Sequence, residues 1–467
     1  MPVGPRLSYE ELAALVVVQA EQIAQLRAEV VELRRQLGQN SRNSSKPPSS
    51  DSPFVKPAPR SLRGKSGRKP GGQKGHSGST LAQVSDPDEM LRHEPGRCGG
   101  CGAGLVDAPE VGLERRQVFD LPPMKVRVIE HRLIARRCAC GTTTCGNAPE
   151  GVTAPVQYGP RITAIILYLY VGQFLSKKRT AVAMAELFGT PVSQGTVATM
   201  THRAAQGLEE FLHQVRDRLA KAEVAGFDET GLRVAGRLHW VHCARTGKYT
   251  LITCHSKRGK AGIDDAGVLG RFRGTAVHDA WAPYDTYLDV THQLCCAHAL
   301  RELAAVAETA PETTWCWASQ VSDALVAMQK LVTEAITAAQ TIDPSALATQ
   351  IHHYRSAAQI GINQTTARSD AVMKRHNALA RRLIERQDDY LRFTHDWRVP
   401  PDNNGSERDI RMIKLRQKVS GCLRTLAGAQ QFCAIRSYLS TTAKHGKHFF
   451  DTLVALAEGH PWLPAIQ

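Results

Sequence analysis

The sequence predicts a multidomain α/β protein, and three observations along its 467 residues predict this class. Apolar residues near the N-terminus repeat alternately four and three positions apart, which is typical of a coiled-coil helix. Two tight cysteine pairs follow a stretch rich in Pro, Ser and Gly, which indicates a small metal-binding domain after a linker. From residue 222, strand-like runs and then alternating helical and strand-like segments indicate a sheet covered by helices.

The net charge of +15 limits the classes of partner. An excess of this size favours polyanions, which are nucleic acids or an anionic membrane surface. The longest apolar stretches, such as ALVVV at 14–18, are too short to span a bilayer, and the first residues do not resemble a secretory signal. Twelve cysteines in such a chain favour reduced thiols and zinc ligation over disulfides. We therefore expect a cytoplasmic protein that binds nucleic acid and no membrane.

Residues 8–37 are predicted to form one coiled-coil helix. Ser8 followed by Glu11 is a capping box that marks its N-terminus. The seam residues are Leu12, Val16, Gln19, Ile23, Leu26, Val30, Leu33 and Leu37. Such a stripe can also pack against the protein's own body. We favour self-association into a homo-oligomer, because a linker separates this helix from the rest of the chain.

Residues 38–85 are predicted to be a basic linker, because Pro, Ser and Gly dominate and leave too little apolar surface to fold alone. Between Ser41 and His76 there are nine Lys or Arg residues and one acid, Asp51. A charge run is commonly a solvated tail, but its concentration in a flexible segment suits contacts with phosphates. The residues predicted to bind DNA here are Lys65, Arg68, Lys69 and Lys74.

Residues 86–150 are predicted to form a zinc-binding ribbon. The two cysteine pairs, each preceded by basic residues and followed by glycine, are Cys98 with Cys101 and Cys138 with Cys140. Cysteines at such spacings lie on knuckle turns whose sulfurs reach one tetrahedral zinc ion. The strand-like segment between the pairs would supply the ribbon's hairpin. Four thiolates leave no open coordination position, so the zinc is predicted to be structural, with Cys145 as an alternate ligand.

Residues 160–220 are predicted to be a helical domain. Two helices are broken at FGTPVS, where Ser193 is placed to cap the second helix. This is the outline of a helix-turn-helix, whose second helix would enter a major groove. An ordinary helical hairpin fits the same pattern equally well, because no base-reading residues accompany it.

Residues 222–308 are predicted to begin a sheet. Three consecutive antiparallel strands, VAGFDETGLRVAG, RLHWVHCARTG and KYTLITCHSKRG, precede a helical stretch and a fourth strand, GTAVHDAW. The following QLCCAHALRELAAVAE is predicted to be helical, and 309–400 to be a helical insertion before the helix that starts in DNNGSERDIRMIKLRQ. This order fits a ribonuclease-H-like core.

Three acids of such a core can converge on one site. Asp228 lies on the first strand and Asp279 on the neighbouring fourth strand, while Glu407 lies on the last helix. Three carboxylates can hold two Mg²⁺ (or Mn²⁺) ions for an in-line phosphoryl transfer. From spacing alone this is a weak signal, because most acids are solvated. The competing acids are Glu229, which strand alternation points to the opposite face, and Asp285, Asp289, Glu302 and Asp402.

Basic residues accompany Glu407 on its helix. Arg411 and Lys414 follow it by four and seven positions, on roughly the same face. Cations beside such an acid suit a phosphodiester backbone. Arg416 and Lys418 also fit a solvated basic face. The residues of this helix predicted to contact DNA are Arg408, Arg411 and Lys414.

The sequence resembles the insertion sequence 66 family of bacterial transposases over nearly its whole length. The motifs that carry the resemblance occur in the family's order. They are QNSRNSSKPPSSD at 39–51, RKPGGQKGHSG at 68–78, the cysteine pairs, DETG at 228–231, CCAHALRE at 295–302, NNGSERDIR at 403–411 and KVSGCLRTLAGAQQFCAIRSYLSTTAKHG at 418–446.

The resemblance implies a transposase of the DDE type, with a leucine-zipper-like N-terminus, a zinc-binding domain and a ribonuclease-H-like catalytic domain. Carried over by position, the catalytic acids are Asp228 of DETG, Asp279 of HDAW and Glu407 of NNGSER. It implies a nucleoid-associated enzyme that cleaves double-stranded DNA at the element's ends and joins those ends to target DNA. His298 and Arg301 of CCAHALRE are expected near the DNA or the metal ions. Accessory proteins of the element are further candidate partners.

Two other functions fit parts of the sequence. A non-enzymatic zinc-ribbon or helix-turn-helix DNA-binding regulator explains the charge and the cysteines, but leaves the three acids without a role. A ribonuclease-H-like nuclease would cut DNA without strand transfer. The expected domains are 8–37, the coiled coil; 38–85, the linker; 86–150, the zinc ribbon; 160–220, the helical domain; 222–308, the first part of the core; 309–400, the helical insertion; and 401–467, the final catalytic helix and C-terminal region.

Overall fold

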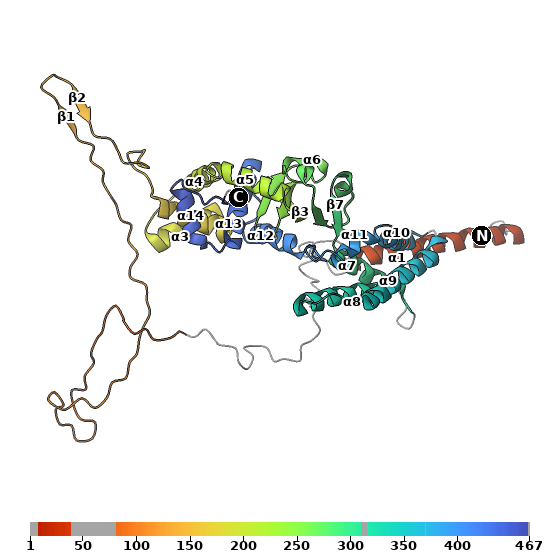
Figure 1. Cartoon of the computed structure of the whole chain (residues 1–467), viewed down its shortest axis with the longest axis horizontal. Coiled ribbons are helices and arrows are strands. Elements are labelled where there is room, and N and C mark those ends of the chain that lie inside the picture. The colour runs from red at the N-terminus through yellow and green to blue at the C-terminus, as the bar shows by residue number, and fades with distance from the viewer. Residues whose placement is uncertain (1–7, 39–80, 310–314, 369, 466–467) are drawn as a thin grey trace, which may run out of the picture. The chain divides into compact units, whose positions relative to one another are not determined.

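The computed structural model describes residues 8–38, 81–309, 315–368 and 370–465 (Figure 1). Clustering of its contacts divides the chain into two compact units. One unit is Lys56–Val128, and the other comprises Met1–Val55 together with Ile129–Gln467. The linker residues predicted to bind DNA, which are Lys65, Arg68, Lys69 and Lys74, lie outside the described residues.

Helix α1 (Tyr9–Gly38) spans the segment with the heptad pattern. The seam side chains that the structure describes are exposed to solvent, with 62% of Val16, 60% of Leu26 and 50% of Leu33 accessible. A helix with an uncovered apolar stripe gains its stability from a partner surface rather than from propensity alone. The self-association of α1 stays a prediction.

The cysteine-rich segment forms a hairpin in a different place from the one predicted. Strands β1 (Ala135–Arg137) and β2 (Thr143–Cys145) pair antiparallel on either side of the second cysteine pair. The segment 111–134, which lies between the two pairs, is described without a strand, so the prediction of a hairpin there is wrong. Its apolar residues, such as Val118 and Val128, are exposed, and alternation alone does not make a strand without a layer to bury one face.

The helical domain consists of α2 (Pro160–Leu167), α3 (Lys177–Phe188), α4 (Gln194–Gln206) and α5 (Glu209–Ala220). Helix α3 ends at Gly189, which adopts a left-handed conformation that suits glycine. Ser193 caps α4 as predicted, because its Oγ accepts from the backbone N–H of Thr196 at 2.9 Å. Helix α4 packs on α3, which fits both the helix-turn-helix and the ordinary helical hairpin.

A five-stranded mixed sheet follows. Its strands are β3 (Val224–Val234), β4 (Arg237–Arg245), β5 (Thr250–His255), β6 (Thr275–His278) and β7 (Thr291–Leu294). The spatial order is β5-β4-β3-β6-β7, with the first three strands antiparallel and β6 and β7 parallel to β3. Helix α6 (Lys260–Asp265) connects β5 to β6.

Strand β7 corrects the sequence prediction, which placed Gln293 and Leu294 at the start of a helix and assigned no element to Thr291 and His292. The helix, α7 (Cys296–Ala307), begins only after β7. Four residues are too few for a periodic signal, and Thr291–Leu294 is extended because it pairs with β6 in parallel register.

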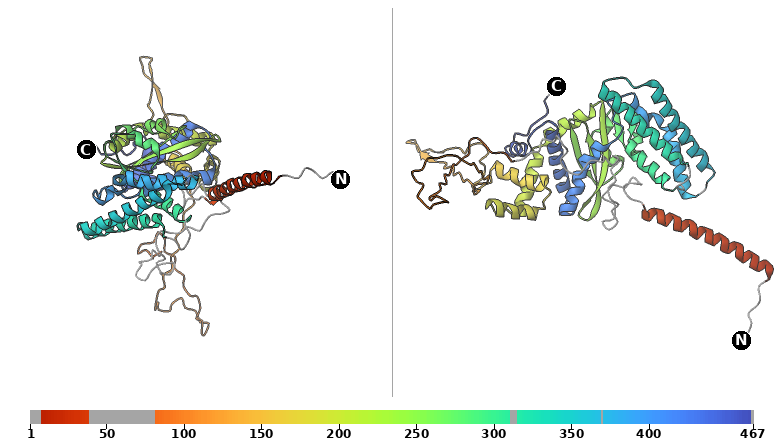
Figure 2. Two further views of the ribbon diagram at one scale, coloured as in Figure 1. Left: turned by 90° about the vertical axis from the view of Figure 1, so that its right-hand side faces the viewer. Right: turned by 90° about the horizontal axis from the view of Figure 1, so that it is seen from below.

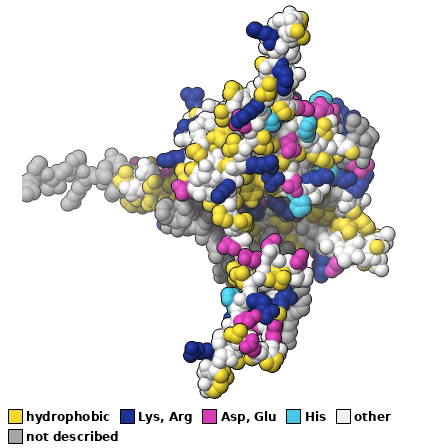
Figure 3. All heavy atoms as spheres, turned by 90° about the vertical axis from the view of Figure 1, so that its left-hand side faces the viewer, with side chains coloured by type: hydrophobic (Ala, Val, Ile, Leu, Met, Phe, Trp, Pro, Cys, Tyr) yellow, Lys and Arg dark blue, Asp and Glu magenta, His cyan; other side chains and the backbone are white. Residues whose placement is uncertain are grey.

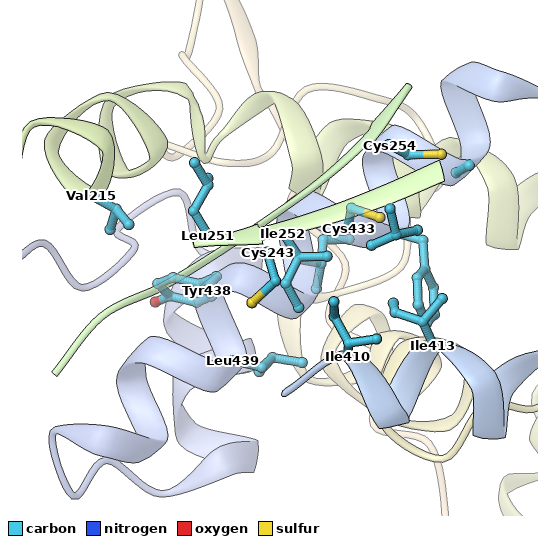
Figure 4. Packing of buried hydrophobic residues seen from close by; sticks show 14 of the residues in the cluster. Val215, Cys243, Leu251, Ile252, Cys254, Ile410, Ile413, Cys433, Tyr438 and Leu439 are labelled. Carbon is cyan, nitrogen blue, oxygen red and sulfur yellow. The ribbon is translucent and has the colours of Figure 1, made fainter. Parts of the chain in front are cut away.

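Helices α12 (Asn404–Ser420) and α13 (Leu426–Lys444) pack against the antiparallel half of the sheet, and α14 (Phe449–Ala457) packs on α13. Figure 4 shows the core between them: Cys243 and Ile252 of the sheet lie close to Ile410 and Ile413 of α12 and to Tyr438 of α13. All five side chains are buried, so this layer fixes α12 relative to β3 and β4.

The insertion forms a second hydrophobic core of its own. Its long helices are α8 (Trp317–Ala338), α9 (Pro344–Thr366) and α10 (Ala371–Glu385), which lie side by side in Figure 2. Helix α7 packs on α8, and the short helix α11 (Gln387–Leu391) packs on β7. The insertion is therefore anchored to the parallel edge of the sheet. Every helix in the described part of the chain is too short or too polar to cross a membrane.

Candidate active site

The first two predicted acids are brought together by the pairing of β3 with β6. The register aligns Gly226 of β3 with Val277 of β6. Asp228 follows Gly226 by two residues, and Asp279 follows Val277 by two residues. The two aspartates are therefore level with each other and point to the same face of the sheet. Asp279 follows the last residue of β6 directly, and its Oδ1 accepts from the backbone N–H of Trp281 at 3.1 Å.

The third predicted acid, Glu407, lies in the first turn of α12. The start of this helix is attached to β3, because Asn403 Nδ2 donates to the carbonyl oxygen of Phe227 at 2.6 Å and Ser406 Oγ donates to Asn403 Oδ1 at 2.6 Å. Both side chains lie over Gly226, on the face of β3 that also carries Asp228. The structure thus places Glu407 on the same side of the sheet as the two aspartates.

The three carboxylates interact electrostatically. Burial raises the pKa of Asp228 well above its usual range, and the charges of Glu229, Asp279 and Glu407 raise it further. Burial, with the nearby charge of Glu229, raises the pKa of Asp279 to about 7. Half-buried carboxylates that repel one another are the type of donor that a hard divalent cation prefers, because the charge of the cation would offset their repulsion.

The acids do not form a closed ligand set. In the described part of the chain, no group of three or more His, Cys, Asp or Glu side chains is arranged so that it could hold a metal ion. Glu407 already has other partners: its Oε1 is 3.0 Å from Arg301 Nη2 and 3.8 Å from His298 Nε2. Burial lowers the pKa of His298 to about 3, so its imidazole is neutral and Arg301 is the charged partner.

Glu229 lies on the opposite face of β3. It accepts from Arg258 Nε at 3.0 Å and Nη2 at 2.7 Å, and from the hydroxyl of Tyr284 at 2.7 Å. Arg258 in turn stacks against Trp240 and Trp281, with its guanidinium carbon 4.9 Å and 4.0 Å from the ring centroids. Glu229 is thus held in a buried ion pair with an aromatic enclosure.

The other competing acids also have partners of their own. Asp285 pairs with Arg386 at 2.6 Å, and Glu302 pairs with Arg382 at 2.6 Å. Asp289 lies 3.5 Å from an exposed arginine, and Asp402 accepts from the N–H of Asn404. These contacts give each acid a structural role outside the group of Asp228, Asp279 and Glu407.

The basic residues of α12 occupy different environments. Arg408 and Arg411 are exposed, whereas the half-buried Lys414 donates from Nζ to the carbonyl oxygen of Gly231 at 2.7 Å. Arg416 is only 4% exposed and donates to the carbonyl oxygen of Gly421, so the alternative of a solvated face does not apply to it. Elsewhere on the surface, Lys and Arg side chains stand on the β1–β2 hairpin and are dispersed over the face in Figure 3.

Both cysteine pairs lie on tight turns. Gly102 N–H donates to the carbonyl of Cys98 at 2.9 Å, and Gly141 N–H donates to that of Cys138 at 2.9 Å. Both glycines have positive φ, 77° and 91°, which explains why glycine follows each pair.

The same turns favour thiolates. A hydrogen bond from the backbone of Cys101 lowers the pKa of Cys98, and the hydroxyl and backbone of Thr142 lower the pKa of Cys140 to about 7. Turns that stabilise thiolates fit a zinc ion. Cys145, the alternate ligand, lies on β2 and its Sγ donates to the carbonyl of Leu133 at 3.6 Å.

Sequence reasoning missed the partners that hold the third acid. Asn403, Ser406 and Gly226 dock α12 on β3, and only their tertiary contact reveals it. For His298 and Arg301 a signal was present, because residues three apart on one helix share a face. Their meeting with Glu407, which is more than a hundred residues away in sequence, could not be read from that spacing.

A mixed five-stranded sheet, with one acid within β3, a second directly after the neighbouring parallel strand β6 and a third on a covering helix, is consistent with a ribonuclease-H-like DDE core. Residues 155–431, more than half of the chain, match the family model described as "Transposase IS66 family". Residues 95–141 match the zinc-finger binding domain of transposase IS66, and residues 4–82 match a family of unknown function (DUF6444). A comparison with curated proteins finds no match.

The chain belongs to the IS66 family of transposases. It is therefore a DDE transposase of an insertion sequence with a zinc-finger region, and a transposase binds DNA. The family also implies zinc and a divalent metal ion.

Proposed function

We propose that this transposase cleaves DNA at the ends of its insertion sequence and joins the freed 3′-hydroxyls to target DNA, with Asp228, Asp279 and Glu407 as the catalytic acids. The observation that carries the proposal is the β3–β6 register. It sets Asp228 and Asp279 level on one face of the sheet, and α12 is docked against that face with Glu407 in its first turn.

Asp228, Asp279 and Glu407 would hold Mg²⁺ (or Mn²⁺). When bound, such ions activate the attacking oxygen and stabilise the leaving oxygen of an in-line displacement. The protein's own contribution is to keep the acids half-buried and rigid: two are placed by strand pairing, and the third by the bonds of Asn403 and Ser406. Preorganisation of this kind removes the cost of gathering like charges during the reaction.

DNA would follow the exposed face of α12. Arg408 and Arg411 are available for phosphates near Glu407, and Lys414 adds positive charge while it remains bonded to Gly231. Electrostatic contact of this kind is independent of base sequence. The basic linker, with Lys65, Arg68, Lys69 and Lys74, would add to it, and the exposed stripe of α1 would join two protomers so that both ends are handled together.

The zinc would be structural. Cys98, Cys101, Cys138 and Cys140 are the proposed ligands, because both pairs lie on turns that favour thiolates. In the proposed order of domains along the chain, this zinc-binding region follows the linker and precedes the helical domain. Helices α3 and α4 would then form a helix-turn-helix that adds DNA contacts.

Cleavage of end-containing DNA tests the catalytic acids. We expect Asp228→Asn, Asp279→Asn and Glu407→Gln each to lower the Mg²⁺-dependent cleavage rate by at least about a hundred-fold, because each removes one carboxylate from the site. Asp289→Asn is the matched control, since this exposed acid lies ten residues after Asp279 and should leave the rate unchanged. Wild-type cleavage retained by Asp228→Asn would overturn the assignment.

The same reaction with end-containing DNA distinguishes the proposed transposase from the two alternatives, a nuclease and a DNA-binding regulator. A product in which an element end is covalently joined to a second DNA molecule supports a transposase with strand transfer. Cleaved ends without joined product would indicate a nuclease. Binding of end DNA without Mg²⁺-dependent cleavage would indicate a DNA-binding regulator.

A further inference from the structure

Arg301 is the arginine that pairs with a proposed catalytic acid in the described part of the chain. It lies on α7, its Nη2 pairs with Glu407 at 3.0 Å, and its Nε donates to the carbonyl oxygen of Ala297 on its own helix at 3.2 Å. The described residues offer no hydrogen-bond partner to its Nη1. By contrast, Arg258 and Arg382 each direct two nitrogens to partners away from Glu407.

Only one of the three acids has a cationic partner. Within the described ranges, neither Asp228 nor Asp279 forms an ion pair with Lys or Arg, whereas Glu407 is paired with Arg301. The pair is partly buried, and burial strengthens the attraction of opposite charges beyond that of a surface pair. A cation that uses Glu407 as a ligand would therefore compete with Arg301 for the negative charge of this carboxylate.

We propose that Arg301 is a further catalytic residue with two states. In the first state it pairs with Glu407 and neutralises it. When Glu407 takes its role as a metal ligand, the guanidinium is released and donates to the reacting phosphodiester. This inference rests on the proposed role of Glu407.

The chemistry of arginine supports the second state. A guanidinium is planar, permanently charged and presents paired N–H donors that match the oxygens of a phosphate. Arg301 has an unused Nη1 and lies within contact distance of a proposed catalytic acid, so little movement is needed to exchange one anion for another. A donor aimed at charge that develops on the phosphate lowers the barrier of the transfer.

Metal binding to the DNA-free protein is the primary test, because it does not depend on activity. Mn²⁺ is titrated into each variant by calorimetry. Arg301→Gln should bind Mn²⁺ more tightly by about three- to ten-fold, because the competitor for Glu407 is gone. Arg301→Lys, which keeps the charge, should remain near the wild type. Arg398→Gln removes an exposed guanidinium that is paired with Asp396, and should leave the affinity unchanged.

A double-mutant cycle assigns the effect to the pair. In a Glu407→Gln background, Arg301→Gln should no longer change Mn²⁺ affinity, since the carboxylate for which they compete is absent. At saturating metal, Arg301→Gln should nevertheless lower the cleavage rate by about a hundred-fold, because the phosphate has lost a donor. Tighter metal binding together with slower cleavage is not expected from a purely structural residue, whose loss would weaken both.

Unchanged or weaker Mn²⁺ binding in Arg301→Gln, a gain that persists in the Glu407→Gln background, or an unchanged cleavage rate would each overturn the proposal. Should Arg301→Gln not fold, Arg301→Met keeps the packing of the aliphatic stem and repeats the measurements. The variant Asp228→Asn distinguishes a wrong role for Arg301 from a wrong assignment of the metal site. If Asp228→Asn binds Mn²⁺ like the wild type, the metal site is wrong; if it does not and Arg301→Gln is silent, only the role of Arg301 is wrong.

Discussion

Glycine at position 226 allows α12 to approach β3 closely. A Cβ added to Gly226 would lie 2.5 Å from Ser406 Oγ and 2.7 Å from Asn403 Oδ1, which is closer than atoms pack. Both atoms belong to the short hydrogen-bonded chain that ends on the carbonyl of Phe227. Because these side chains are buried, they cannot move aside without breaking their bonds. Asp228 follows Gly226 by two residues on β3. The close approach of α12 to Gly226 therefore also sets the distance between Asp228 and Glu407.

Gly226→Ala should therefore destabilise the protein by about 1–3 kcal/mol, the usual cost of inserting a methyl group into a filled contact. It should also lower Mg²⁺-dependent cleavage, because Glu407 moves with the start of α12. The free energy of unfolding is measured by urea titration. Gly247→Ala is the control, since a Cβ there meets no atom within 4 Å. Equal stability of Gly226→Ala and the wild type would contradict the docking role.

On the scale of an element, α12 serves three purposes on its different faces. Its first turn carries Glu407, and its inner face buries Ile410 and Ile413 in the core. Its outer face exposes Arg408 and Arg411. Lys414 lies between these faces, where its pKa is lowered by burial and its Nζ bonds to β3. The helical period distributes these roles, because residues three or four apart share a face.

We expect the two basic positions to respond differently to alanine substitution. Arg411→Ala should weaken DNA binding and reduce the dependence of log affinity on log salt by about 0.9, the value of one lost phosphate contact. Lys414→Ala should reduce that slope less and instead lower stability by about 1 kcal/mol, because it removes a hydrogen bond between α12 and β3. Fluorescence anisotropy across a salt series measures the slope.

Lys330→Ala controls for the loss of a positive charge as such. This lysine is exposed on α8 in a pair with Glu334, away from α12 in sequence and structure. Its removal should leave the slope unchanged. A slope that falls equally for Lys330 and Arg411 would mean that net charge, rather than the face of α12, governs DNA binding.

On the scale of the whole molecule, the proposed joining of both element ends requires that two DNA ends reach one catalytic assembly. The described side chains of the α1 stripe are exposed within one chain, which is unfavourable for Val16, Leu26 and Leu33 unless a partner covers them. A second copy of the same stripe is the partner that the heptad repeat specifies. Self-association through α1 would thus couple two active sites.

Leu26→Ala together with Leu33→Ala should convert the oligomer to monomers, because two layers of the seam lose their apolar contacts. Multi-angle light scattering measures the mass in solution. Glu21→Ala with Gln25→Ala changes two exposed positions of α1 outside the seam and should leave the mass unaltered. An unaltered mass in the leucine variant would rule out assembly through this stripe.

Local chemistry made much of this protein predictable from its sequence. The capping residue Ser193, the glycines after the cysteine pairs and the alternation that separates Asp228 from Glu229 each depend on neighbours within a few residues. Short-range rules for caps, turns and strands act on such neighbours directly. The predicted neighbouring strands for Asp228 and Asp279 also occur, as β3 and β6.

Tertiary structure alone decided the features that join distant segments. Strand β7 exists because β6 pairs with it, Arg416 is buried because α13 covers it, and Glu407 meets Arg301 because the start of α12 lies against α7. In each case the energy comes from burial and pairing between residues far apart in sequence, and such contacts leave no local periodicity. The sequence by itself therefore determined which acids and cysteines could act, and the packing decided which side chains hold them in place.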